Sequence, residues 1–149
     1  MRRAIKLLLL LSTAATIGTA CADDSLHKAA YRGEIDTVKQ LLSRKPLDVD
    51  ARDSSGGTAL HAAMFQDNLQ IVELLLANQF DPNAVGPRNG YTPLHDAVWA
   101  GNAKAAELLL QRGARADIKG KDGLTPFMKA ERENKPALVD VFRRHGITR

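Results

Sequence analysis

A set of residues recurs along this chain at a spacing of thirty-four positions. The repeated residues are Leu60, His61 and Ala63, followed one period later by Leu94, His95 and Ala97. Two leucine runs, residues 74–76 and 108–110, keep the same spacing. Self-similarity at a fixed period of roughly 20–50 residues is typical of chains that stack small units in a row. The sequence therefore predicts an array in which each unit contacts its neighbours, rather than a single globule.

Four units account for almost all of the sequence after residue 22. Thr58 and Thr92 keep the thirty-four-residue spacing, and Thr125 follows Thr92 at thirty-three. Leu26 and His27 lie one period before the second unit. The predicted units are residues 23–52, 53–86, 87–119 and 120–149.

Each unit is predicted to contain two short helices. Apolar residues recur at helical spacing, as in Leu69, Val72, Leu75 and Leu76. Neither helix could bury its apolar side alone, so stacking on the next unit must supply the missing surface.

Helix boundaries can be predicted from the repeated polar residues and prolines. Thr58, Thr92 and Thr125 are predicted N-caps, and Pro93 and Pro126 follow at the first helical position, where a missing N–H costs little. Pro136 lies near the start of the last helix, where a proline is also tolerated. The residues expected to adopt a left-handed backbone between the two helices are Gly33, Asp67, Gly101 and Asn134.

Some positions depart from the repeat. Gln79 stands where Gly113 ends the corresponding helix, which predicts a less regular helix end. Residues 85–88 carry one extra residue, so the turn there should differ from the others. Met128 replaces the repeated histidine and Arg143 replaces a core leucine, as a terminal unit with no later neighbour requires.

The units resemble ankyrin repeats. The match rests on Gly90-Tyr91-Thr92-Pro93-Leu94-His95-Asp96-Ala97, then on residues 105–110 and Gly113-Ala114. Residues 53–84 match about as well, and residues 121–127 open a fourth, degraded unit. The resemblance implies an all-α solenoid of about four helix-turn-helix units joined by β-turn or hairpin fingers. It also implies protein binding.

The N-terminal segment has the pattern of a secretory signal peptide over residues 1–22. A basic start is followed by an apolar run at residues 7–11, and Ala20 and Ala22 flank Cys21 in an Ala-x-Ala cleavage site. Cleavage before Asp23 would give a periplasmic or secreted domain with no membrane insertion. The apolar run is shorter than a membrane-spanning helix requires.

A lipoprotein signal is the alternative interpretation of the same segment. Residues 18–21 form a loose lipobox that would leave Cys21 as a lipidated first residue of an outer-membrane lipoprotein. Gly18 stands where a leucine-like residue is usual, so the Ala-x-Ala site is the better match.

Charge and cysteine content exclude two further classes. The formal net charge is +4, of which Arg2, Arg3 and Lys6 supply three, so cleavage leaves about +1. With no basic stripe, nucleic acid is not expected as a partner. Cys21 is the only cysteine, so the mature domain would have no disulfide. The free domain is predicted to be a monomer.

No catalytic residue, metal site or cofactor is predicted. His27, His61 and His95 recur in register, but equivalent positions of stacked helices lie roughly 8–10 Å apart, too far to share one ion. The ankyrin resemblance implies that this histidine braces the turn and the helix start. His145 is interpreted as a helix-end cation. The repeated carboxylates, expected on solvated helix faces, are Asp36, Glu73, Glu107 and Asp140.

One series goes beyond what the scaffold demands. Tyr31, Phe65 and Trp99 share one phase, and Arg132 continues it. In ankyrin arrays this phase and the next lie near the end of the first helix, on the concave face. Aromatic residues and arginine are frequent interface anchors. The aromatics could instead pack on one another and stiffen the stack. The predicted partner-binding residues, including turn tips, are Tyr31, Arg32, Phe65, Gln66, Arg88, Asn89, Tyr91, Trp99 and Arg132.

The sequence thus predicts an exported module that binds a protein partner through its concave face and turn tips. It could stabilise or inhibit a periplasmic protein, for example as an immunity protein against a toxin. The competing hypothesis is a lipid-anchored structural or scaffold protein of the envelope. The identity of the partner does not follow from the sequence.

Overall fold

The fold is described by a computed structural model for residues 24–148. The predicted leader, with Ala20, Cys21 and Ala22, lies outside the described residues. The helices are α1 (Asp24–Arg32), α2 (Ile35–Leu42), α3 (Ala59–Ala62), the 3-10 turn η1 (Ala63–Phe65), α4 (Leu69–Ala77), α5 (Pro93–Ala100), α6 (Ala103–Gln111), α7 (Pro126–Arg132) and α8 (Pro136–Arg144). None of these helices has the length and apolar character needed to cross a membrane.

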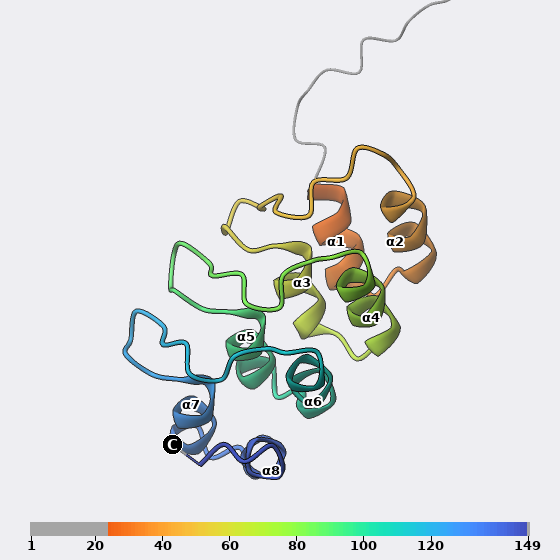
Figure 1. Cartoon of the computed structure of the whole chain (residues 1–149). Coiled ribbons are helices and arrows are strands. Elements are labelled where there is room, and N and C mark those ends of the chain that lie inside the picture. The colour runs from red at the N-terminus through yellow and green to blue at the C-terminus, as the bar shows by residue number, and fades with distance from the viewer. Residues whose placement is uncertain (1–23, 149) are drawn as a thin grey trace, which may run out of the picture.

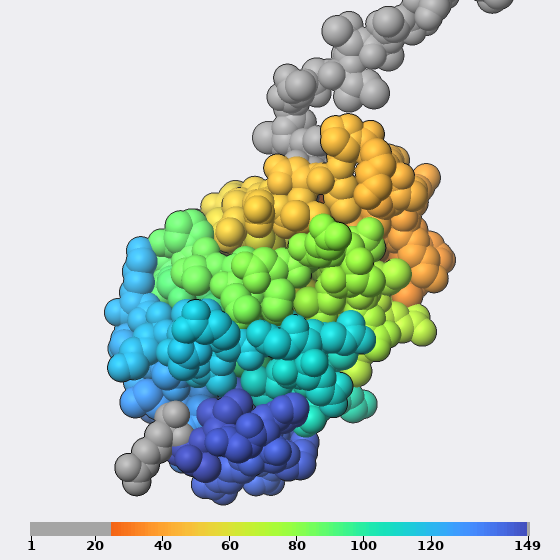
Figure 2. All heavy atoms as spheres, viewed as in Figure 1, coloured from red at the N-terminus to blue at the C-terminus, as the bar shows by residue number. Residues whose placement is uncertain are grey.

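The helices form two layers, as Figure 1 shows. The first helices of the pairs (α1, α3, α5 and α7) stack in chain order in one layer, and the second helices (α2, α4, α6 and α8) stack beside them. In Figure 2 the segments succeed one another across the molecule in sequence order. Completely buried residues such as Leu60, Leu75, Leu94 and Leu109 form one continuous core between the layers. The structure confirms the predicted all-helical repeat architecture.

Three long loops project from the first-helix layer (Figure 1). They are here called the first, second and third fingers and comprise residues 43–58, 78–92 and 112–125. Each closes with a hairpin-like backbone bond, although no strand is formed within residues 24–148. The N–H···O pairs are Asp53 to Gly57 (3.0 Å), Gly86 to Tyr91 (2.8 Å) and Gly120 to Leu124 (2.9 Å). The hairpin-like turn of the second finger is therefore one residue longer than those of the other two, as the extra residue in 85–88 predicts.

The repeated histidines have a structural role, as predicted. Nδ1 of His61 accepts hydrogen bonds from the backbone N–H (3.1 Å) and the hydroxyl (2.9 Å) of Thr58, the N-cap of α3. Its Nε2 lies 3.2 Å from the carbonyl oxygen of Tyr91. Because a carbonyl oxygen only accepts and a backbone N–H only donates, the ring must be the neutral Nε2–H tautomer. His95 repeats this arrangement with Thr92 and Leu124.

Two turn predictions need correction. Gly33, Gly101 and Asn134 have positive φ, as expected, but Asp67 does not. In this unit α3 tightens into η1 and Gln66 is extended (φ −137°), so the chain reverses without a left-handed residue. The second correction concerns Gln79, which has φ 67° and so takes the same left-handed conformation as Gly113 at φ 86°. The helix end is regular, but a residue with a Cβ holds it.

The fourth unit packs its two helices through a pair of aromatic rings. Phe127 and Phe142 are buried and meet edge to face with ring centroids 5.9 Å apart. Arg143 and Met128 are exposed. Their exposure agrees with the capping character predicted for both positions.

Candidate protein-binding surface

The aromatic series forms a ladder across three units. Tyr31 is the penultimate residue of α1, Phe65 ends η1 and Trp99 lies in the last turn of α5. The ring centroids of Tyr31 and Phe65 are 6.0 Å apart, and those of Phe65 and Trp99 are 5.4 Å apart in an edge-to-face contact. The side chains remain 59%, 37% and 62% exposed, in chain order. The rings thus pack along the stack and also present a connected apolar surface, so both interpretations of the series hold in part.

A hollow of about 700 Å³, here called the inner groove, runs along this ladder. It is bounded by the first helices and by the first two fingers. Six of the predicted binding residues line it, and they are Tyr31, Arg32, Phe65, Arg88, Asn89 and Trp99. Large exposed rings beside a groove with polar walls are typical of protein-binding surfaces.

The other three predicted residues lie outside the lining. The amide of Gln66 donates to the carbonyl oxygens of Ala63 and Asn68, and so holds the loop between two helices. Arg132 is exposed, with a guanidinium nitrogen 3.9 Å from a carboxylate oxygen of Asp122. These two side chains are engaged with their own chain rather than with the groove.

Tyr91 turns toward the third finger. Its ring stacks on His95 with centroids 4.9 Å apart, and its hydroxyl donates to Asp122 at 2.8 Å. The ammonium of Lys129 donates to the same hydroxyl at 2.8 Å and lies 4.6 Å from the ring centroid. A Cβ at Gly120 would come within 2.6 Å of the Tyr91 ring, so the glycine permits this approach. Tyr91 therefore links two units.

A second series, which the sequence analysis did not single out, lies beneath the ladder. Lys28, Ala62, Asp96 and Lys129 each precede a ladder position by three residues, one helical turn. Asp96 is buried and lines the inner groove, and Lys129 is buried in the next unit. The regular spacing is a signal that could have identified these positions.

Burial determines the charge state of the groups at the groove. Burial lowers the pKa of His61 to about 4, so this ring is neutral at neutral pH. Burial raises the pKa of Asp96 to about 7, an effect that the positive charge of Lys129 only partly offsets. Asp96 therefore changes its charge near neutral pH, while His61 does not.

The fingers are fastened to one another along the stack. Arg52 donates to the carbonyl oxygen of Val85 at 3.1 Å, and Arg88 donates to that of Ser54 at 3.3 Å. The backbone N–H of Lys121 donates to the carbonyl oxygen of Asn89 at 2.8 Å. These bonds hold the finger tips at fixed positions beside the groove.

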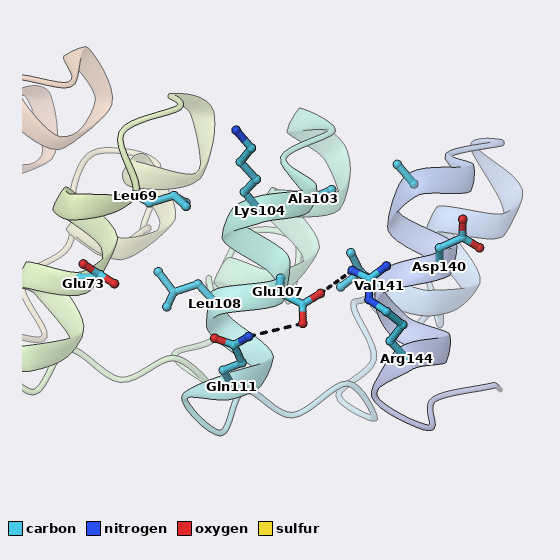
Figure 3. Close-up of a pocket in the computed structure, with 11 residues that line it drawn as sticks. Leu69, Glu73, Ala103, Lys104, Glu107, Leu108, Gln111, Asp140, Val141 and Arg144 are labelled. Atoms are coloured by element: carbon cyan, nitrogen blue, oxygen red, sulfur yellow. Dashed lines mark hydrogen bonds and ion pairs between the residues drawn. The ribbon is translucent and has the colours of Figure 1, made fainter.

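A second hollow, of about 720 Å³, lies on the layer of second helices between α4, α6 and α8 (Figure 3). Here Glu107 extends toward α8 and accepts from Arg144 at 2.6 Å, and it also binds His145 at 2.7 Å. These hydrogen bonds lower the pKa of Glu107. Glu107 thus lies on a solvated helix face, as predicted, and it also joins the last two units. Glu73 likewise lies 3.9 Å from Arg112.

No group of three or more histidine, cysteine, aspartate or glutamate side chains within residues 24–148 is placed to hold one metal ion. Comparison with known protein families matches the ankyrin repeats (3 copies) over residues 3–86 and 26–122. The chain therefore belongs to the ankyrin-repeat family, whose members are generally non-catalytic modules that bind proteins. No curated protein matches the chain.

Proposed function

We propose that this chain is an exported ankyrin-repeat module that binds a protein partner through the inner groove and the adjoining finger tips. The observation that carries the proposal is the ladder of Tyr31, Phe65 and Trp99, which stays exposed although its rings contact one another. Aromatic side chains of this kind supply large contact areas with few rotatable bonds. A partner that covered them would remove a connected apolar surface from water.

Rigidity supports the same proposal. The ladder stands on helices whose starts are capped by Thr58 and Thr92, and the neighbouring finger tips are joined by the hydrogen bonds described above. A surface that is already ordered loses little conformational entropy on docking. By occupying a partner's surface, such a module would stabilise or inhibit that partner, and the export signal expected in residues 1–22 directs the proposal to periplasmic proteins.

A capture experiment tests the proposal. The purified chain and the double variant Phe65→Ala/Trp99→Ala are each used to capture proteins from an envelope extract. Loss of two large anchors should weaken binding by about 100-fold or more, since a single anchor truncation typically costs about 2 kcal/mol, or roughly 30-fold. The partner retained by the wild-type chain should therefore be missing from the variant.

The matched control is Val85→Ala/Met128→Ala, which also truncates two exposed apolar side chains but lies outside the groove lining. Circular dichroism establishes that each variant is folded. A folded Phe65→Ala/Trp99→Ala chain that captures the same partner in the same amount would exclude the ladder as the binding surface.

Attachment to the membrane distinguishes the second candidate, a lipid-anchored envelope scaffold. Cys21, in the sequence context of a loose lipobox, is the observation that favours it. Mass spectrometry of the mature N-terminus separates the two. A chain that begins at Asp23 is a released periplasmic or secreted module, whereas a chain that begins at a lipidated Cys21 is an outer-membrane lipoprotein.

A further inference from the structure

The floor of the inner groove carries a carboxyl group to which the fold gives no hydrogen bond. Asp96 is 9% exposed, and no donor within residues 24–148 bonds to its carboxyl oxygens. Every completely buried side-chain nitrogen or oxygen in this part of the chain has a partner. The oxygens of Asp96 are therefore open to the groove that this residue lines. A nearly buried carboxyl without a donor is costly for a fold, and so indicates a ligand that supplies the donor.

The groove has room beside this carboxyl group because the equivalent residue of the preceding unit is small. Ala62 has the equivalent position in the preceding unit and lines the same groove. Its short side chain fills little of the room that a larger residue would occupy. Phe65 and Trp99 stand one helical turn further on, with their rings in contact at 5.4 Å. The result is a hollow with a carboxyl group at its floor and aromatic rings along its wall.

We propose that the inner groove accepts one lysine or arginine side chain of the protein partner, with its charged end at Asp96 and its alkyl stem against Phe65 and Trp99. A carboxylate is the natural counterpart of an ammonium or guanidinium group. Aromatic rings attract cations, and the stems of long basic side chains cover apolar surface. An acidic side chain would meet a like charge, and an aliphatic one would leave the carboxyl unpaired. The inference rests on the proposed function and adds the chemistry of the contact.

The charges around Asp96 are consistent with this occupant. The ammonium of Lys129 is already engaged, with Tyr91 at 2.8 Å and with Glu133 at 3.3 Å. Arg32, which lines the groove, lies 3.8 Å from Glu34, and both side chains are exposed. Because the rim is basic, the residues next to the inserted side chain should be neutral or acidic. The charged and titratable groups that line the inner groove with Asp96 are His27, Lys28, Tyr31, Arg32, Asp53, His61 and Arg88, and Lys129 acts on Asp96 from the next unit.

Four short peptides of one design test the proposal directly. Each is an acetylated and amidated Gly-Ser-Xaa-Ser-Gly, with lysine, arginine, norleucine or glutamate at Xaa. Binding to the purified chain is followed by nuclear magnetic resonance and by the fluorescence of Trp99, the chain's single tryptophan. The lysine and arginine peptides should shift the signals of Phe65 and Trp99 in a saturable way. The norleucine and glutamate peptides should bind at least about tenfold more weakly.

Asp96→Asn is the central variant, because it keeps the shape of the side chain and removes its charge. It should weaken the binding of the basic peptides by about tenfold. For the wild-type chain, affinity should also rise between about pH 6 and about pH 8, as Asp96 ionises, and the variant should show no such rise. His61, which is neutral across this range, cannot produce the same dependence.

Two results would overturn the inference. One is equal affinity of the basic and norleucine peptides for the wild-type chain, and the other is unchanged binding of the basic peptides to Asp96→Asn. The outcome is independent of the capture experiment. A partner lost with Phe65→Ala/Trp99→Ala but kept in full with Asp96→Asn would leave the proposed function standing and remove the basic contact.

Discussion

Gln79 holds a backbone conformation that suits glycine. Its φ of 67° lies in the left-handed region, and its side chain is exposed, so no visible contact compensates for the strain. Gln79→Gly should therefore raise the free energy of unfolding by about 1 kcal/mol. A residue with a Cβ is destabilised by about 1–2 kcal/mol in the left-handed conformation, and glycine is not. The greater conformational entropy of glycine in the unfolded chain offsets part of this gain. Urea denaturation measures the change. Gly113→Ala, at the same position of the next unit, should be destabilising, and a loss of stability in Gln79→Gly would contradict the argument.

Two buried groups make opposite contributions to the pH dependence of stability. His61 has a pKa of about 4 in the folded chain against an ordinary value of 6.5, so between these values the unfolded chain binds the extra proton and acid destabilises the fold. Asp96 has a pKa of about 7 against 3.8, so over its interval the folded chain binds the extra proton and acid stabilises the fold. The intervals overlap, and the two effects oppose each other.

Comparison of the wild-type chain with Asp96→Asn isolates the contribution of Asp96 to the pH dependence of stability. Above pH 7 the variant should be more stable than the wild-type chain, because it no longer buries a carboxylate. The difference in stability should shrink by about 1.4 kcal/mol for each pH unit between 7 and 4. The reason is that the folded wild-type chain binds one more proton than the unfolded chain over this range. Urea denaturation of both chains across this range measures the difference. A difference that does not vary with pH would show that Asp96 is ionised to the same extent in the folded and unfolded chains.

The joints between helix pairs depend on the residue that opens each second helix. Asn102 is the N-cap of α6 and accepts from the N–H of Ala105 at 3.0 Å. Its amide also donates to the carbonyl oxygens of Met64 (3.2 Å) and Gln66 (3.0 Å), which satisfies the end of the previous first helix. Lys135 does the same for the next joint, donating to Val98 and Trp99 at 2.6 Å each. The two bonds from Lys135 therefore fix the backbone that carries Trp99.

Asn102→Ala should cost more than the loss of a cap alone. Asn68 is the matched control, because it is also an N-cap and accepts from Gln70, but its side chain makes no such bond to the preceding unit. Each variant loses a cap worth about 1 kcal/mol. Asn102→Ala also leaves two carbonyl groups without their donor and should cost about 1 kcal/mol or more beyond Asn68→Ala in urea denaturation. Equal losses would mean that water replaces the bonds between units.

The elements themselves were predictable where a pattern repeats. Threonine N-caps, prolines at the first helical position and apolar spacing depend on local chemistry, and the structure has them at Thr58, Thr92 and Thr125. The η1 turn was not predictable, because the tightening of α3 depends on its packing. In the site, the ladder was visible as a period. Asp96 was missed because its importance lies in burial and in a missing donor, which only the packed array reveals.

At the scale of the molecule, stability in a stack is a sum of units and of contacts between neighbours. The first helices contact one another in chain order, and so do the second helices. The ladder crosses the first three units, while the fourth unit supplies Lys129 and Lys135, which hold Tyr91 and the end of α5. The fourth unit therefore acts on the groove indirectly, because it holds the end of α5, which carries Trp99.

A substitution that destabilises the fourth unit should consequently unfold that unit alone. It should nevertheless change the mobility of the groove residue Trp99. Phe142 is completely buried, so Phe142→Ala should cost about 3–5 kcal/mol in the stability of its own unit. Hydrogen exchange measured by mass spectrometry should show lost protection in α7 and α8, while α3 to α6 stay protected. Trp99 should nevertheless become more mobile, since Lys135 no longer holds the carbonyl at the end of α5. A uniform loss of protection from α1 to α8 would instead show that the array unfolds as one cooperative unit, and the groove would then require all four helix pairs.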